Sequence, residues 1–176
     1  MNIGILALQG SFLEHGLVLK KLNKNFSFVK DKKSLEKITH LIIPGGESTT
    51  IFKLLDQTGM WKILEQKIKK NTISIFGTCA GAIICEKLGA NFSIQRNAYG
   101  GQLSSFISDL NSKIFKNLKG VFIRAPKILV KKNQVKILAY FEKEPVLVHD
   151  KKFLAASFHP ELNNEARIYE YFLNNF

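Results

Sequence analysis

Short apolar segments alternate with amphipathic segments through the first half of the chain, and this alternation restricts the possible folds more than any other feature. The apolar segments have the length of buried strands, and the segments between them have apolar residues at helical spacing. Alternating strands and helices predict a mainly parallel sheet covered by helices on both faces. The expected strands are Asn2–Leu8, Phe26–Val29, Ile38–Ile43 and Ile73–Phe76; the expected helices are Phe12–Leu22, Thr49–Leu55 with Ser48 as its cap, Met60–Ile68 and a segment from Ala80 to about Glu86.

The helical pattern weakens between residues 90 and 157 and returns in a closing helix over Asn163–Leu173. The strands expected there, several of them antiparallel, are Ile94–Gln95, Gly120–Ile123, Val135–Phe141, Pro145–Val148 and Phe153–Phe158. A length of 176 residues suits one domain. The predicted fold class is therefore α/β, with three layers, a mainly parallel central sheet, helices on both faces and antiparallel additions, in a single domain over residues 1–176.

A net charge of +12 raises the question of nucleic-acid binding. The lysines are scattered along the chain without a basic stripe or interleaved aromatic residues, so we expect no nucleic-acid partner. The N-terminus has no basic segment and its apolar run stops at Leu8, which predicts a core strand rather than a signal peptide. No apolar run approaches the roughly 20 residues of a membrane span. With only two cysteines, too few for a disulfide framework, we expect a cytoplasmic protein away from membranes.

Cys79 lies in the segment Gly77–Gly81 (GTCAG), between an expected strand and an expected helix. A nucleophile on a tight strand-to-helix turn needs small neighbours, and the helix N-terminus favours the thiolate. The backbone N–H of Ala80 would then be placed to bind an oxyanion. The alternative is that the two glycines flank a structural cysteine by chance. Cys85 has no such turn beside it and is expected to be a buried apolar residue.

His159 and Glu161 follow the last expected strand and are separated by Pro160. Side chains two positions apart on extended backbone share a face, and proline favours an extended conformation at the residue before it. The pair therefore suits a base and the carboxylate that orients it, although a surface histidine beside an unrelated carboxylate would have the same spacing. The other histidines, His15, His40 and His149, lack such a partner and are expected to be structural or solvated.

The segment Pro44–Thr50 (PGGESTT) follows another buried strand. The glycines Gly45 and Gly46 permit close approach of backbone N–H groups to a ligand, so this loop can supply the second half of an oxyanion hole. A phosphate-binding loop or a plain turn are the alternatives, and the Walker pattern is absent. Only three of the 26 basic residues are arginines: Arg96, Arg124 and Arg167. An arginine among so many lysines suggests a site that needs a planar, bidentate cation.

Six stretches in this order resemble the class I (triad) glutamine amidotransferases, and more narrowly the glutaminase subunits of pyridoxal 5′-phosphate synthase, the PdxT family. They are Leu6–Gly10 (LALQG), Pro44–Thr50, Gly77–Gly81, Arg96–Gly100 (RNAYG), Phe122–Pro126 (FIRAP) and Ser157–Leu162 (SFHPEL). The resemblance spans nearly the whole chain and implies a flavodoxin-like, class I amidotransferase-like fold. It also implies hydrolysis of L-glutamine to L-glutamate and ammonia, without a cofactor or a metal ion.

The resemblance further implies roles for individual residues. Cys79 would attack the side-chain amide to form a thioester, His159 would transfer protons, and Glu161 would orient His159. Gly46 and Ala80 would supply the oxyanion hole, and the glutamine-binding residues would be Gly45, Gly46, Glu47, Arg96, Ile123 and Arg124. Which arginine holds the α-carboxylate stays open.

The family passes ammonia through a tunnel to a barrel-shaped synthase subunit within a large hetero-oligomer. That subunit builds pyridoxal 5′-phosphate from a pentose phosphate and a triose phosphate. Free glutaminase subunits are expected to be poorly active until the partner reshapes the oxyanion loop.

The sequence departs from the family pattern at three places. Gly101 replaces an arginine usual in the family, the segment between Cys79 and Arg96 is shorter than expected, and Asn163 to Glu165 depart from the usual residues.

Three other functions compete with this interpretation. A glutaminase that serves another synthase, such as that of histidine biosynthesis, would not be expected to carry the PGGESTT, RNAYG and FIRAP stretches. A silent binding module would be expected to have lost a triad residue, yet Cys79, His159 and Glu161 are all present. An autonomous cysteine hydrolase or protease would not need the arginines of the glutamine site.

Overall fold

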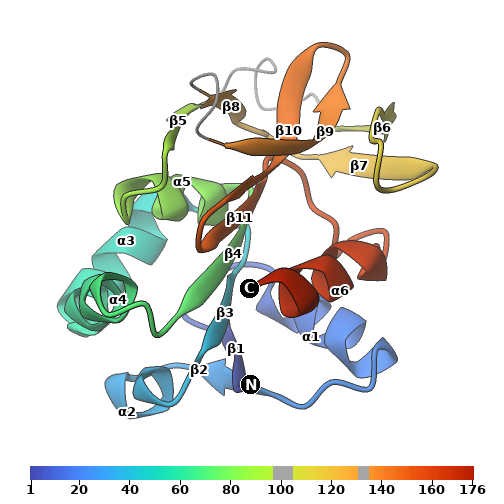
Figure 1. Ribbon diagram of the computed structural model, residues 1–176. Coiled ribbons are helices and arrows are strands. Elements are labelled where there is room, and N and C mark those ends of the chain that lie inside the picture. The colour runs from blue at the N-terminus through green and yellow to red at the C-terminus, as the bar shows by residue number, and fades with distance from the viewer. Residues whose placement is uncertain (97–104, 131–134) are drawn as a thin grey trace.

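A seven-stranded sheet forms the centre of the computed structural model, which describes residues 1–96, 105–130 and 135–176 (Figure 1). Its strands lie in the order β2-β1-β3-β4-β11-β10-β9. The first five of these run parallel, whereas β10 and β9 are antiparallel additions at one edge. The bounds are β1 Ile3–Leu6, β2 Phe26–Val29, β3 His40–Ile43, β4 Ser74–Thr78, β9 Lys136–Phe141, β10 Glu144–Asp150 and β11 Phe153–Ala156. The predicted fold class is confirmed.

Helices cover both faces of the sheet (Figure 1). Helices α1 (Phe12–Lys21) and α6 (Ala166–Asn175) lie on one face. The other face carries α2 (Lys32–Glu36), α3 (Ser48–Gln57), α4 (Met60–Lys69) and α5 (Ala80–Lys87). Two two-stranded sheets flank the central one, formed by β5 (Phe92–Gln95) with β8 (Lys127–Val130) and by β6 (Phe106–Leu110) with β7 (Leu118–Phe122).

The central strands are buried on both faces, which explains their continuous apolar sequences. Successive side chains of β4 enter different cores: Phe76 packs with α1 and α6, and Ile75 packs with the helices of the opposite face. Strand β3 divides in the same way, with Ile42 in the first core and its neighbours in the second. Each core joins residues from the N-terminal and C-terminal halves of the chain.

Several sequence predictions were wrong in detail. The sequence did not predict α2, β6 or β8, which are short and carry exposed positions. Helix α6 begins at Ala166 rather than Asn163, because Asn164 has a φ of 55° and breaks the helical path. Strands β1 and β11 end earlier than predicted, at Leu6 and Ala156, and the residues that follow them turn toward the carboxyl edge of the sheet.

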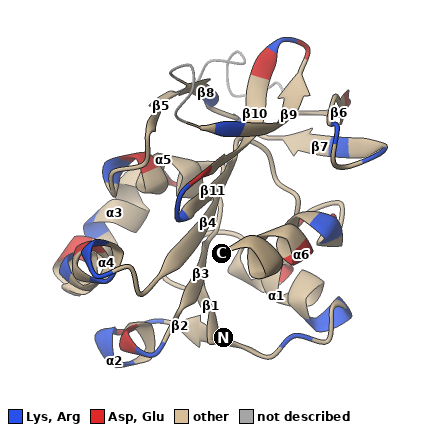
Figure 2. Cartoon of the chain, in the orientation of Figure 1, with Lys and Arg blue, Asp and Glu red and all other residues tan. Residues whose placement is uncertain are grey.

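Basic residues are spread over helices on both faces and over several strands rather than gathered on one element (Figure 2). This distribution matches their scatter along the sequence. None of the described helices combines the length and the apolar character that crossing a membrane requires.

The cap of α3 also differs from the prediction. Glu47, rather than Ser48, occupies the N-cap position, and its carboxylate accepts hydrogen bonds from the backbone N–H groups of Thr49 (3.0 Å) and Thr50 (2.5 Å). Hydrogen bonds from Thr50 and Thr49 lower the pKa of Glu47 to about 2. Ser48 is buried as the first residue of the helix. A carboxylate at this end of a helix binds two otherwise unpaired donors and interacts favourably with the helix dipole.

Replacing Glu47 with alanine should lower the free energy of unfolding by about 1 kcal/mol, because the backbone N–H groups of Thr49 and Thr50 lose their acceptor. Urea unfolding of the variant and the wild type measures the difference. Ser48→Ala is the matched comparison and should cost less, since Ser48 is not the N-cap residue. A larger loss of unfolding free energy in Ser48→Ala than in Glu47→Ala would contradict the assignment of Glu47 as the N-cap residue.

Candidate active site

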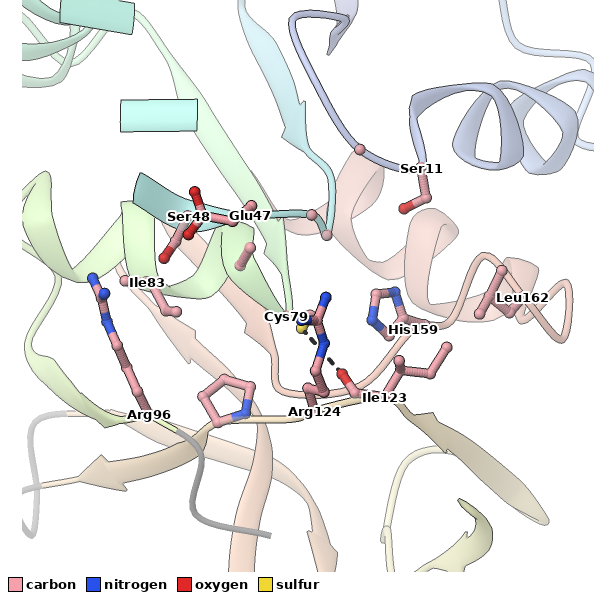
Figure 3. A pocket seen from close by; sticks show the side chains of 15 residues that line it. Ser11, Glu47, Ser48, Cys79, Ile83, Arg96, Ile123, Arg124, His159 and Leu162 are labelled. Atoms are coloured by element: carbon pink, nitrogen blue, oxygen red, sulfur yellow. Dashed lines mark hydrogen bonds between the residues drawn. The ribbon is translucent and has the colours of Figure 1, made fainter. Parts of the chain in front are cut away.

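Four neighbouring parallel strands end at one edge of the sheet, and the residues that follow them meet there. Gly10 and Ser11 follow β1, Gly45 follows β3, Cys79 follows β4 and His159 follows β11. They line a cavity of about 400 Å³, a size suited to a small ligand (Figure 3). Ligands of open α/β sheets bind at this edge. The cavity is lined by Gly10, Ser11, Gly45, Gly46, Glu47, Ser48, Cys79, Ala80, Ile83, Arg96, Ile123, Arg124, Pro126, His159 and Leu162.

Cys79 stands on a strained turn between β4 and α5. Its φ of 48° and ψ of −104° lie outside the usual regions for a residue with a side chain, and α5 begins at the next residue, Ala80. The turn also requires glycine nearby: a Cβ on Gly81 would lie 2.1 Å from the backbone oxygen of Ile43. The sulfur therefore lies at a helix N-terminus, where the dipole favours a thiolate.

The Cys79 thiol faces two other groups in the cavity. The Cys79 sulfur lies 3.8 Å from the carbonyl oxygen of Ile123, and the thiol donates a hydrogen bond to that oxygen (Figure 3). The ring of His159 lies beside the thiol as well (Figure 3). A Cβ on Gly45 would sit 2.3 Å from the Cε1 atom of His159 and 3.4 Å from the Cβ of Cys79. Glycine at position 45 is thus needed for the loop to pass this close to both side chains.

His159 and Glu161 form a buried pair. The Nδ1 atom of His159 lies 2.7 Å from Oε1 of Glu161, and both residues are buried. Burial disfavours the imidazolium, but the Cys79 sulfur and the Glu161 carboxylate outweigh burial and raise the pKa of His159 to about 10. A high pKa on this imidazole favours transfer of a proton to it from the neighbouring thiol.

The Glu161 carboxylate is held in its charged form. Burial would raise its pKa, but the neighbouring imidazoles of His15 and His159 lower the pKa to about 2. The hydroxyl of Ser11 also donates to Oε1, at 2.8 Å. A buried carboxylate with hydrogen bonds from an imidazole and a hydroxyl can fix the tautomer of that imidazole and stabilise its positive charge.

The loop Gly45–Gly46 is fixed to the segment that follows β1. The N–H of Ser11 donates to the carbonyl oxygen of Gly45 at 3.1 Å, and the side-chain oxygen of Gln9 accepts from the N–H of Glu47 at 2.9 Å. The N–H of Gly45 donates to the hydroxyl of Thr78, also at 3.1 Å. Gly46 and Ala80 line the same cavity as Cys79.

Two arginines line the same cavity from different segments, Arg96 at the end of β5 and Arg124 after β7 (Figure 3). Arg124 has a φ of 47°, so this residue too adopts an unusual backbone conformation at the cavity. The third arginine, Arg167, lies on α6 and donates hydrogen bonds to Glu165 through Nε and Nη2, both at 2.6 Å. The structure thus separates the two predicted ligand-binding arginines from the third.

Every residue predicted for the site lines the cavity or contacts a residue that does. Glu161 lies behind His159, and Glu47 lines the cavity while its carboxylate caps α3. The rest of the RNAYG stretch, residues 97–100, and Gly101 lie outside the described residues. Within the described ranges, no group of three or more His, Cys, Asp or Glu residues could hold a metal ion.

Sequence reasoning missed several residues that contact the site, among them Ser11, His15 and Thr78. The expectation that His15 is structural or solvated overlooked its position, because its Nε2 atom lies 3.7 Å from Oε1 of Glu161. Ser11 and His15 are four residues apart and so share one face at the start of α1, a spacing that could have grouped them. His40 and His149 are structural: His40 contacts the carbonyl oxygen of Phe176, and His149 contacts the Tyr171 hydroxyl.

Cys85 lies in a different environment from Cys79, although both thiols are free. It lies inside α5, is completely buried among apolar residues, and burial raises the pKa of its thiol. A buried thiol of this kind is chemically inert. Cys85 is therefore a packing residue, as the sequence predicts.

Comparison with known proteins gives one consistent result. Residues 5–176 match the model of the SNO glutamine amidotransferase family. A protein of Thermosipho africanus named pyridoxal 5′-phosphate synthase subunit PdxT is 40% identical over 99% of this chain and 98% of its own. A protein of the same name from Francisella tularensis is 42% identical over 98% of this chain and 97% of its own.

Solved structures agree with the sequence comparison. A crystal structure of a glutamine amidotransferase superposes with a TM-score of 0.90 at 40% identity, covering 99% of this chain and 98% of the other. PurLQS from Thermotoga maritima, at 15% identity, shares the fold with a TM-score of 0.73 over 98% of this chain and 97% of that chain. By its sequence along almost its whole length and by its fold, the chain belongs to the SNO glutamine amidotransferase family.

Proposed function

We propose that the chain hydrolyses L-glutamine to L-glutamate and ammonia through the triad Cys79, His159 and Glu161. The ammonia would serve a partner synthase subunit in the formation of pyridoxal 5′-phosphate. The observation that carries this proposal is a cysteine on a strained turn at a helix N-terminus, next to an imidazole that is paired with a buried carboxylate at 2.7 Å. Membership of a glutamine amidotransferase family gives this arrangement its substrate.

In the first half of the reaction, Cys79 transfers its proton to His159 and its sulfur attacks the side-chain amide carbon of glutamine. The N–H groups of Gly46 and Ala80 stabilise the oxyanion that develops on the amide oxygen. His159 then donates the proton to the leaving nitrogen, the carbon–nitrogen bond breaks, and ammonia departs. Glu161 stabilises the imidazolium through the Nδ1 hydrogen bond. A thioester between Cys79 and the glutamyl group remains.

In the second half, water attacks the thioester while His159 accepts one of its protons. The carbon–sulfur bond breaks, the proton returns to the sulfur of Cys79, and glutamate leaves. The same oxyanion donors serve both steps because the thioester carbonyl occupies the place of the amide carbonyl. The positive φ of Cys79 holds its sulfur at this place throughout the cycle.

The charged ends of glutamine require opposite charges in the cavity. Arg96 and Arg124 line the cavity and offer guanidinium groups for the α-carboxylate, and Gly45, Gly46, Glu47 and Ile123 line the same cavity. A guanidinium can bind a carboxylate through two parallel hydrogen bonds, which fixes the orientation of the ligand as well as its position.

The relatives named as subunits of pyridoxal 5′-phosphate synthase support a synthase partner for this chain. We place that partner as a barrel-shaped subunit in a large hetero-oligomer, with ammonia passing between the two active sites. The whole chain, residues 1–176, acts as one glutaminase domain in the cytoplasm. Two free cysteines, one of them the nucleophile, suit a reducing compartment.

The experiment is to measure ammonia and glutamate release by the chain alone and after mixing with the synthase subunit encoded in the same genome. Stoichiometric release of both products that rises strongly with the partner is the expected result. Full activity of the isolated chain would contradict the coupling, and no release in either condition would contradict the glutaminase assignment.

A further inference from the structure

A second histidine lies behind the triad, and the reaction described above does not use it. His15, on α1, is completely buried, and its ring has a polar neighbour at each nitrogen. Its Nδ1 atom lies 2.6 Å from the hydroxyl of Tyr169, and its Nε2 atom lies 3.2 Å from the hydroxyl of Thr78. The same Nε2 atom is 3.7 Å from Oε1 of Glu161.

His15 is neutral near pH 7. Burial lowers its pKa, Glu161 opposes this effect, His159 lowers the pKa further, and Glu14 raises it. Tyr169 keeps its proton because burial and the charge of Glu161 raise its pKa well above the usual value. The site thus holds one buried negative charge, on Glu161, and His15 contributes as a dipole rather than as a cation.

The carboxylate decides which ring nitrogen of His15 carries the proton. A bare Nε2 lone pair would face the negative charge of Glu161, whereas an Nε2–H would point positive charge at it. The neutral ring therefore carries its proton on Nε2 and accepts at Nδ1 from the hydroxyl of Tyr169. The Nε2–H donates to the Thr78 hydroxyl and lies near the carboxylate.

These contacts close a polar ring of five residues, Gly45, Thr78, His15, Glu161 and Ser11. The N–H of Gly45 donates to Thr78, which contacts His15, and His15 faces Glu161. Ser11 completes the circuit, because its hydroxyl donates to Glu161 and its N–H donates to the carbonyl oxygen of Gly45. The polar ring thus joins the triad carboxylate to the loop that carries Gly46.

The carboxylate depends on this ring. His159, Ser11 and His15 all approach the Glu161 side chain at one oxygen, Oε1. Its other oxygen, Oε2, is buried and accepts no hydrogen bond from any of the described residues. Rotation of Glu161 or of Thr78 would therefore disturb the triad and the Gly45–Gly46 loop together.

We propose that His15 is a positioning residue for the glutaminase reaction, which fixes Thr78 and Glu161 so that the triad and the oxyanion loop keep one geometry. This inference rests on the proposed function. Under this inference α1 contributes to catalysis through His15, and α6 contributes through Tyr169. Neither helix does so by contact with the substrate. The polar ring would be preformed in the subunit before glutamine enters.

The test compares three replacements of His15 in the complex of the chain with its synthase partner. Leucine removes both polar atoms, glutamine places an amide near the Nε2 position, and asparagine places one near the Nδ1 position. We expect His15→Leu to lower kcat for glutamate release by about 10-fold to 100-fold, with KM little changed, since misplacement of catalytic groups acts on the chemical step. His15→Gln should restore more of kcat than His15→Asn.

His40→Leu is the matched control, because it also removes a buried histidine with two polar contacts, and His40 lies on β3 outside the cavity lining. It should lower the melting temperature without changing kcat. Unchanged kcat in His15→Leu, or equal kcat in the glutamine and asparagine variants, would overturn the positioning role. If His15→Leu does not fold, the kcat values of His15→Gln and His15→Asn still test the positioning role.

A second measurement needs no activity. Nitrogen NMR of the isolated subunit with labelled histidine should show His15 neutral and protonated on Nε2 near pH 7. A charged His15, or a proton on Nδ1, would overturn the inference. Absence of glutaminase activity in the wild-type complex would instead overturn the proposed function, so the two failures are distinguishable.

Discussion

Replacing Cys79 with alanine should lower glutamine hydrolysis by the synthase-bound subunit by about 10⁴-fold or more. In the proposed mechanism the sulfur of Cys79 forms the thioester, and no other described nucleophile occupies its position at the N-terminus of α5. Binding of glutamine should survive, because the arginines and the loop at Gly45 remain in place. Glutamate release in the complex and glutamine binding by calorimetry measure the two effects separately.

Cys85→Ala is the matched control for this variant. It removes the other thiol of the described chain, one that is completely buried inside α5 and does not line the cavity. We expect a loss of stability of about 1–2 kcal/mol from the lost packing and unchanged kcat. A comparable loss of activity in both variants would show that the helix, rather than the sulfur of Cys79, had been disturbed.

Replacing Glu161 with glutamine should lower kcat by about 10³-fold to 10⁴-fold, although the side chain keeps its size. In serine proteases, exchange of the triad carboxylate for an amide has an effect of about this size because the histidine takes the wrong tautomer, and the same physical reason applies to Glu161. An amide at this position cannot accept from both His159 and Ser11 at the same oxygen while also stabilising the imidazolium by charge. The tautomer of His159 would no longer be fixed.

Glu165→Gln is the matched control, because Glu165 pairs with Arg167 on the surface of α6. It should leave kcat unchanged. A small effect of Glu161→Gln, similar to that of Glu165→Gln, would mean that His159 works without a charged partner and that the triad assignment is wrong.

The stability difference between the wild type and Glu161→Gln should also depend on pH. The pKa of Glu161 falls from 4.5 to about 2 on folding. Its contribution to the free energy of unfolding is therefore present above pH 4.5 and is lost as the pH falls toward 2. The pKa of His159 rises from 6.5 to about 10 on folding. Its contribution to the free energy of unfolding is therefore complete below pH 6.5 and is lost as the pH rises through 10. The difference should therefore be largest between pH 4.5 and 6.5, as measured by urea unfolding. A difference that grows toward pH 10 would contradict the pairing.

Most of the fold could be predicted from the sequence because its central strands are buried on both faces. Such strands are continuous apolar runs, and the helices α1, α3 and α4 between them show a clear apolar spacing. The elements that were missed, α2, β6 and β8, are short and partly exposed, so their patterns carry little apolar signal. The position of Cys79 could be predicted too, because the glycines of the turn and the start of α5 are adjacent in the sequence.

The contacts behind the triad could not be predicted in this way. His15 and Tyr169 lie on α1 and α6, at opposite ends of the chain, and only the packing of both helices on one face of the sheet brings them together. The cap of α3 was missed for a different reason. Both Glu47 and Ser48 suit an N-cap position, and the exact first turn depends on how the Gly45–Gly46 loop is held by Gln9 and Ser11.

The position of β11 has a consequence for how the protein acquires its reactivity. This strand pairs in parallel with β4, with Leu154 opposite Phe76, so the centre of the sheet is completed only by a late segment of the chain. Contacts between such distant segments form slowly, because a long loop must close before they contribute. A growing chain would carry Cys79 long before His159 is synthesised. We therefore expect the thiol to lack its imidazole partner during synthesis and to meet it only when the last strand enters the sheet.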